Sequence, residues 1–445
     1  YIYTLMSLFN KLFKSGPSAA DAKTKVFTPG RYVDINKKPQ QLEAWNTSKK
    51  LFEEKKYLDS VYQLCLYLKD PAIENLQVTR NDYSVEFEIT QGSKVIKGIA
   101  TNDAVTAETR IASYKTPSIA FLRKLMNYNF SLQYNRFAVK DNVVYLKFTS
   151  KTIDASPNKL YYSLKELALK ADKLDDVLIN EFPMLEPIDV SHVTMPDNAI
   201  VEARYNYMIR WINEDMQRIA ALNEDRMSGA ISYILLALIF RIDYLLVPQG
   251  SILNDIEKIN GIYNANDGKT PVERNRQMIE ELKKLSGRDK EDLKKEFYDI
   301  KAVFGYVSAT SHKTFYEFVL DQFKNTDWYY NNRYDDIVQS IYEYTIGYSA
   351  FSFGMYPATF EMLALLSNVL HNDFFKEMGV TAEYYNKASG KFNVPAIEKE
   401  TQRIINTHKK DFPKLQMLTN KIQYRNMNEF LYTYLNEMTY LNFSK

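Results

Sequence analysis

The chain has 445 residues, of which 45% are hydrophobic and 25% charged, a composition typical of two or three folded domains rather than of a disordered protein. Its 57 Lys and Arg residues almost balance its 55 Asp and Glu residues, so no overall charge would attract nucleic acid. Cys65 is the only cysteine, which excludes an intrachain disulfide and a cysteine-rich metal site and favours the reducing cytoplasm.

Residues 1–14 have a narrow apolar face, which predicts a docking helix or a helix at a membrane surface. A terminal helix packed on its own protein is the plainer alternative. No basic region precedes this face, so no signal peptide is predicted, and Met6 is an alternative start of the chain. Residues 15–40 form an arm or linker. The apolar face consists of Leu5, Leu8, Phe9, Leu12 and Phe13.

Residues 41–68 have the apolar spacing of a helix, and Cys65 lies on its apolar side as a core residue. Alternating residues then predict strands over 83–90, 94–101 and 104–114. The third strand is more polar, so we expect it near an edge or on the solvent face of a sheet. A helix through Tyr128 follows Pro117. Its inward residues are predicted to be Ile119, Leu122 and Met126.

Residues 129–182 predict two strands and a long helix. The strands cover 129–140 and 143–150, and Asp141 and Asn142 between them tolerate the positive φ of a tight hairpin turn. Ser156 and Pro157 begin the helix as N-cap and first residue. Its apolar stripe crosses one face of the sheet and comprises Leu160, Leu164, Leu167, Ala168, Ala171, Leu174 and Leu178.

This element order resembles the fold of type III secretion chaperones and their bacterial YbjN-type relatives. The best match is NFSLQYNRFAVKDNVVYLKF with the helix LYYSLKELALKADKLDDVL, and the resemblance covers residues 41–182. It implies a five-stranded antiparallel sheet with packed helices, often a homodimer, that binds other proteins without catalysing a reaction. The secretion chaperones themselves are small, acidic, single-domain proteins, whereas this chain is near neutral and much longer.

Residues 183–199 contain three prolines and predict a linker, and residues 200–445 predict an all-α domain. No fixed-period repeat occurs there. The most apolar stretch, residues 230–247, is interrupted by Arg241 and Asp243, which favours a buried helix over a membrane span. Helices are predicted over 200–225, 228–247, 251–264, 270–286, 289–304, 311–325, 333–350, 356–378, 380–389, 395–409 and 427–441.

Three short motifs suggest chemistry, and none is convincing. His371 and Asp373 do not share a helix face, which argues against a metal site. Residues 264–268 look like the start of a calcium loop. With Gly268 at the sixth position of such a loop, the twelfth position is Arg274, where a glutamate is needed. Arg403 and His408 have the spacing found in a helical ribonuclease family, yet such a pair arises easily by chance, and Ile404 stands where that family has a polar residue.

The densest aromatic cluster starts at residue 328. It predicts either an interaction surface or pocket wall, or ordinary packing between helices. Nearby acidic residues argue against nucleic-acid stacking. The candidate surface residues are Trp328, Tyr329, Tyr330, Arg333 and Tyr334.

We therefore expect an α+β domain followed by an all-α domain in a non-catalytic protein-binding or assembly module. Its partner would be another protein or a second copy of the chain. No catalytic, cofactor-binding or metal-binding residue is assigned. Two alternatives stay open: an enzyme or small-ligand binder with a pocket in the aromatic helical domain, and a peripheral membrane protein held by residues 1–14.

Overall fold

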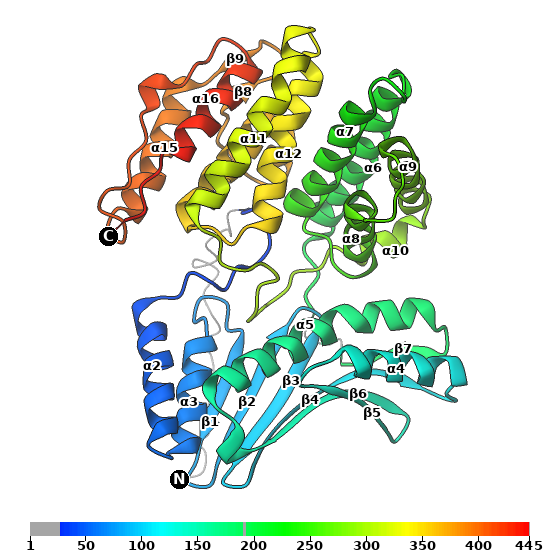
Figure 1. The fold of residues 1–445 in the computed structure, drawn as a ribbon, viewed down its shortest axis with the longest axis vertical. Helices are drawn as coiled ribbons and strands as arrows, with labels where there is room; N and C mark the ends of the chain where they lie inside the picture. Colours follow the sequence, from blue (N-terminus) through cyan, green and yellow to red (C-terminus); the bar gives the residue numbers. More distant parts are fainter. Residues whose placement is uncertain (1–26, 190–192, 445) are drawn as a thin grey trace, which may run out of the picture.

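The computed structural model describes residues 27–189 and 193–444 (Figure 1). Residues 39–187 hold an antiparallel sheet with its helices, here called the sheet part. Residues 198–439 are mostly helical and are called the helical part. The predicted fold class is confirmed, whereas the predicted helix at residues 1–14 lies outside the described residues.

Two helices precede the sheet where the sequence predicts one. They are α2 (Pro39–Glu53) and α3 (Tyr57–Leu68), and the chain reverses at Lys55 with a left-handed φ of 63°. Ser48 and Ser60 hold the pair together, because each hydroxyl donates to the other residue's carbonyl at 2.7 Å. No glycine or proline marks this turn, so the helical pattern of the sequence runs through it. Cys65 in α3 is buried, which raises the pKa of its thiol to about 12.

The sheet has seven strands in the order β1-β2-β3-β4-β6-β5, with β7 beside β4. The three strands predicted between residues 83 and 114 are confirmed as β2, β3 and β4, whereas β1 and β7 were not predicted. The expectation that β4 lies near an edge is wrong, because β4 pairs with both β3 and β6. The strands are β1 (Leu76–Arg80), β2 (Ser84–Gln91), β3 (Lys94–Thr101), β4 (Ala104–Tyr114), β5 (Arg136–Lys140), β6 (Val143–Lys151) and β7 (Leu185–Pro187).

The predicted strand over 129–140 is half wrong. Helix α4 (Ile119–Ser131), capped by Ser118, continues to residue 131, and only β5 is extended. The side chain of Asn129 pairs with both backbone groups of Phe137, at 2.5 and 3.1 Å. The Glu166 carboxylate accepts the backbone N–H groups of residues 133–135. The contacts of Glu166 come from more than thirty residues away, which explains why local alternation failed.

Helix α5 (Pro157–Glu181), strand β6 and the turn before β6 match the prediction. Ser156 caps the helix, and its whole predicted stripe is buried against the sheet. Asp141 and Asn142 have positive φ in the turn. The other face of the sheet carries charged residues across neighbouring strands, with ion pairs of 3.2 Å between Lys97 and Glu88 and 2.6 Å between Lys147 and Glu108. That face is therefore solvated.

Gly98 in β3 allows Phe87 of β2 to lie over the sheet. A Cβ at residue 98 would overlap the Phe87 ring, which is 3% exposed. We expect Gly98→Ala to lower the free energy of unfolding by about 1–3 kcal/mol, the usual effect of overpacking. Gly261→Ala is the control, because nothing lies near Gly261 in its helix, and we expect it to stabilise by up to about 1 kcal/mol. Urea unfolding measures the stability of both variants, and equal unfolding midpoints for Gly98→Ala and Gly261→Ala would contradict the packing argument.

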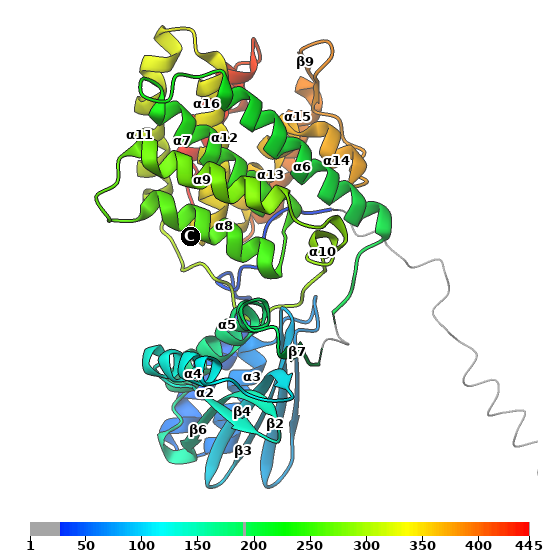
Figure 2. The same cartoon turned by 90° about the vertical axis from the view of Figure 1, so that its right-hand side faces the viewer.

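The helical part has two apolar cores, and Figures 1 and 2 show its helices above the sheet part. One is formed mainly by α6 to α10 together with α14, and the other mainly by α11, α13, α15 and α16, while α12 contributes to both. The helices are α6 (Asn198–Ala220), α7 (Ser228–Arg241), α8 (Gly250–Asn264), α9 (Pro271–Ser286), α10 (Lys290–Lys294), α11 (His312–Asn331), α12 (Asp335–Ser352), α13 (Pro357–Leu370), α14 (Asn372–Glu377), α15 (Val394–His408) and α16 (Met427–Thr439).

Three of the predicted helices in this part are wrong in extent or kind. Of residues 289–304 only α10 is helical, and residues 380–389 fall instead in a small hairpin of β8 (Tyr385–Asn386) and β9 (Lys391–Phe392). The helix predicted over 356–378 breaks at His371. The apolar helix Ser228–Leu246 is long and apolar enough to cross a membrane, but 89% of it is buried within the protein. Its last turn is a π-helix, Ile242–Leu246.

Loops join the two parts. Residues 300–305 return from the helical part to the sheet, where Val303 and Phe304 enter the sheet's core. The buried Gln91 accepts both of their N–H groups at 3.0 Å and donates to the carbonyl of Phe304. The described end of the predicted arm is also fixed, because Arg31 donates to Asp243 at 2.6 Å. Residues 27–36 are thus packed against the helical part rather than forming a free linker.

Candidate functional site

Helix α4 carries a row of large apolar side chains that no described element covers. Ile119 is 72% exposed, Met126 70% and Phe130 96%, and Leu122 between them is 38% exposed. Their spacing places all four on one side of the helix. Figure 1 shows α4 at the opposite end of the sheet part from α2. We call these four residues the α4 surface.

The prediction that Ile119, Leu122 and Met126 point inward is wrong. Phe121 and Leu125, one turn apart on another side of the helix, face the core instead. The outward row is longer than the inward pair, so a choice based on periodicity selects the wrong side. A signal was nevertheless present: the helix has more apolar residues than one sheet face can cover.

The charges on and near α4 are mostly positive. The helix contains Arg123 and Lys124 and no acidic residue. Lys124 pairs with Glu181 at 2.8 Å. Within the described part of the chain, Arg123 and Lys140 form no ion pair. The α4 surface is therefore apolar with a basic margin.

The predicted aromatic surface at the turn between α11 and α12 is partly exposed. Trp328 is 55% and Tyr330 49% exposed, and the Trp328 ring stacks on Tyr334 at 5.8 Å between centroids. Arg333 is exposed and has the left-handed backbone conformation in this turn, with a φ of 63°. Tyr329, by contrast, packs against both helical cores. The predicted N-terminal docking face, from Leu5 to Phe13, lies outside the described residues.

A cleft of about 490 Å³ opens between α6, α7, α12 and the end of α13. On its floor, the Glu343 carboxylate accepts two N–H groups of Arg241 and Nε2–H of His371, the latter at 2.7 Å. Arg241 also donates to Asp215 at 3.2 Å, and Asp215 accepts from Arg218 at 2.7 Å. Burial opposes ionisation of Glu343, but Arg241 and His371 hold its pKa far below the usual value.

The contacts of His371 in this network bear on the metal site considered for His371 and Asp373 from the sequence. Its ring binds Glu343, not Asp373, and within residues 27–189 and 193–444 no group of three metal-ligating side chains could hold a metal ion. Arg241 and Asp215, like Glu343, find their partners inside the protein. A network whose charges are matched internally is suited to joining the two helical cores.

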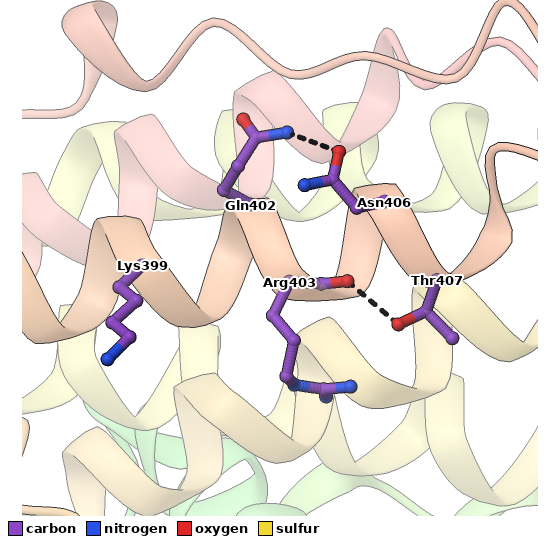
Figure 3. Close-up of a pocket in the computed structure, with 5 residues that line it drawn as sticks. All are labelled: Lys399, Gln402, Arg403, Asn406 and Thr407. Carbon is purple, nitrogen blue, oxygen red and sulfur yellow. Dashed lines mark hydrogen bonds between the residues drawn. The ribbon is translucent and has the colours of Figure 1, made fainter.

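The Arg403 and His408 pair is also satisfied internally. Both donate to the Glu361 carboxylate of α13, at 2.7 and 2.6 Å. Figure 3 shows the surface pocket around Arg403, whose lining residues all come from α15. Within it Gln402 donates to Asn406, and the Thr407 hydroxyl donates to the Arg403 carbonyl. One side of a single helix provides no opposite wall for a substrate.

The α4 surface is thus the strongest candidate for a functional site, and its function would be binding. It offers apolar side chains and no nucleophile or general base. No protein-family model matches this chain, and no curated protein matches it either.

Proposed function

We propose that this protein is a non-catalytic binding module of the cytoplasm, which holds a segment of another protein on the α4 surface. The single observation that carries the proposal is the exposure of the four α4 residues. The resemblance to secretion chaperones supports it, since members of that fold class bind other proteins. The predicted homodimer is a rival occupant of the same surface.

The exposed row is unusual because contiguous large apolar residues on a soluble protein mark interaction sites. Burying one such side chain contributes about 1.5–3 kcal/mol to binding. Hot spots of protein interfaces are built from a few side chains of this kind, surrounded by a polar rim. Phe130 and Met126, being largely exposed, have the most area left to bury.

The basic margin selects the kind of partner. Arg123, on the same helix as the apolar row, would complement an acidic side chain that flanks an apolar segment. Two copies of the chain would bring like charges together, which disfavours self-association through α4. We therefore propose an amphipathic helix or strand with flanking Asp or Glu residues as the occupant.

Binding of synthetic peptides tests this proposal. The probe is an amphipathic peptide with Leu and Phe on one side and Glu on the other, and its partner probe has Lys in place of Glu. We expect the Glu peptide to bind more tightly, and the double variant Met126→Ser with Phe130→Ser to weaken its affinity at least about tenfold, as loss of one buried side chain would. Fluorescence anisotropy measures both affinities.

Tyr83→Ser is the matched control, because Tyr83 is 78% exposed and lies outside α4. We expect it to leave peptide binding unchanged. Equal loss in the control and the double variant, or no binding of either peptide, would overturn the proposal. A dimer in sedimentation that the double variant abolishes would assign the surface to a second copy. Binding to anionic vesicles but not to peptide would assign it to a membrane.

A further inference from the structure

Arg204 in α6 is a buried cation that forms no ion pair with any residue the structure describes. The residue is only 7% exposed, and its Nε is buried with no hydrogen-bond partner among the described residues. Among the described residues no carboxylate forms an ion pair with it, and Asp299 acts on it only at longer range. Burial lowers the pKa of its guanidinium, yet an arginine stays protonated in proteins.

The contrast with Arg241 shows why this is informative. Arg241 is equally buried and is matched by Glu343 and Asp215. A buried charge with no counterion is costly, so buried polar groups without partners need an explanation such as a ligand or an ordered water. The charges in the cleft over Arg241 are therefore matched by ion pairs, whereas no carboxylate of the described residues forms an ion pair with Arg204.

Arg204 lines the cavity beside it, which has a volume of about 810 Å³. The walls come from the arm at residues 27–32, the start of α6, the end of the π-helix, residues 298–300 and the end of α14. This size suits a small organic molecule. Much of the lining is apolar: Phe27, Met195, Ile200, Val247, Ile300 and Met378.

The acidic residues around the cavity are exposed to solvent, whereas Arg204 is buried. The lining also includes Asp197, Asp299 and Glu377, but all three are exposed, so water screens them. Arg31 in the lining is already paired with Asp243. Arg204 is thus the unpaired charge held away from solvent. Screening weakens the repulsion between the exposed acids and an anion without removing it, and this repulsion is larger for a ligand with two negative charges than for one with a single charge.

We propose that this cavity binds an organic monoanion, a carboxylate with an apolar body, whose carboxylate pairs with Arg204. The planar guanidinium can hold a carboxylate by two parallel hydrogen bonds. The apolar body would lie against Ile200, Val247 and Met378. This site lies in the helical part and is independent of the proposed α4 function.

Titration calorimetry of the whole chain with octanoate tests the site. We expect octanoate to bind, and 1-octanol and octylammonium to bind at least about tenfold more weakly, because charge-assisted hydrogen bonds are the stronger kind. Inorganic phosphate, which carries more charge and no apolar body, should not bind. Equal binding of octanoate and 1-octanol would overturn the assignment of Arg204 as the anion site.

Arg204→Met removes the guanidinium and keeps an apolar side chain of similar length. We expect it to weaken octanoate binding at least about tenfold and to raise the melting temperature of the ligand-free protein, since an unmatched buried charge is lost. Arg210→Met is the control on the same helix, because Arg210 is half exposed and lies over the Tyr207 ring. It should leave octanoate binding unchanged.

A second variant guards against misfolding of Arg204→Met. Ile200→Trp narrows the cavity without touching the guanidinium, and we expect it to weaken octanoate binding as well. Unchanged octanoate affinity in both variants would overturn the proposal. A lower melting temperature in Arg204→Met, with no octanoate binding to the native protein, would show that Arg204 is held by water and serves only the fold.

Discussion

Replacing Glu343 by alanine is expected to lower the free energy of unfolding by about 3–5 kcal/mol, because it leaves Arg241 buried without its main counterion. The Arg241 side chain is 7% exposed and that of Glu343 10%, so water cannot replace the lost partner. Asp215 would remain, but it contacts only one nitrogen of Arg241, at 3.2 Å. Chemical denaturation monitored by the tryptophans, of which Trp211 lies beside this network, measures the effect.

Glu361→Ala is the matched control. Glu361 also joins an arginine and a histidine, Arg403 and His408, but its side chain is 33% exposed and Arg403 is 51% exposed. Exposed pairs contribute about 0–1 kcal/mol, so the control should lose no more than that. An equal loss in both variants would mean that burial of the Glu343 network does not matter.

Replacing both members of the buried pair by apolar residues tests whether Glu343→Ala loses stability through the unmatched charge or through lost packing. The double variant Arg241→Met with Glu343→Leu should recover most of the stability that Glu343→Ala loses, because no unmatched charge remains. The pKa of Glu343 is depressed, so its contribution is complete above the unfolded pKa of about 4.3 and is lost as pH falls further. The difference between native and double variant should therefore shrink in acid.

Local patterns predicted the regions whose structure is decided locally. Helix α5 has a cap at Ser156 and an uninterrupted apolar stripe, and the turn at Asp141 and Asn142 uses residues suited to positive φ. The edge position expected for the polar third strand is wrong because one of its two neighbours is distant: β6 follows β4 by some thirty residues and pairs along almost its whole length. Pairing partners that far apart leave no mark on local alternation.

The candidate sites were harder to predict than the fold. The α4 surface depends on which of two apolar sides meets the sheet, and tertiary contacts through Phe121 decide that. Arg204 resembles any other arginine of an amphipathic helix until its surroundings are known. His371 was noted for its neighbours in sequence, yet its partner Glu343 is 28 residues away. Composition cannot reveal whether a buried charge is matched.

The joint between the two parts contains a cluster of acids, of which Asp175 is buried and the other three are partly buried. Asp172, Asp175 and Asp176 project from α5, and Glu296 follows α10. Lys94 pairs with Asp175 at 2.9 Å, and Ser93 and Tyr306 donate to Asp172. Figure 2 shows α5 at the boundary between sheet part and helical part. Ionisation of these groups therefore acts on the contact between the parts.

Burial, and then the charges of Asp175 and Glu296, raises the pKa of Asp176 well above its usual value. Burial and the charge of Asp175 raise the pKa of Asp172 to about 7, although Ser93 and Tyr306 oppose this. Burial also raises the pKa of Glu296, against the charge of Arg288. Lys94 is the cation of the cluster facing α5, and its charge lowers the pKa values of Asp175 and Asp176.

Asp176→Asn is therefore expected to stabilise the protein at pH 8. The folded protein holds protons that the unfolded chain releases near pH 4, so this source of stability is present in acid. It is lost as pH rises from about 4 through the folded pKa. Asparagine cannot ionise, and a gain of at least about 1.4 kcal/mol, the equivalent of one pKa unit, should appear at pH 8 and vanish near pH 4.

Glu166→Gln provides a control of opposite sign. Burial raises the pKa of Glu166, but the backbone N–H groups of Gln133 and Tyr134 outweigh it and lower the pKa. Its carboxylate thus stabilises the folded state above the unfolded pKa of about 4.3, and that contribution is lost as pH falls. Glu166→Gln should destabilise the protein at pH 8 and have little effect in acid.

If thermal unfolding shows the same pH slope for the native protein and Asp176→Asn, the acids of α5 are not protonated in the fold, and the joint between the two parts does not respond to pH.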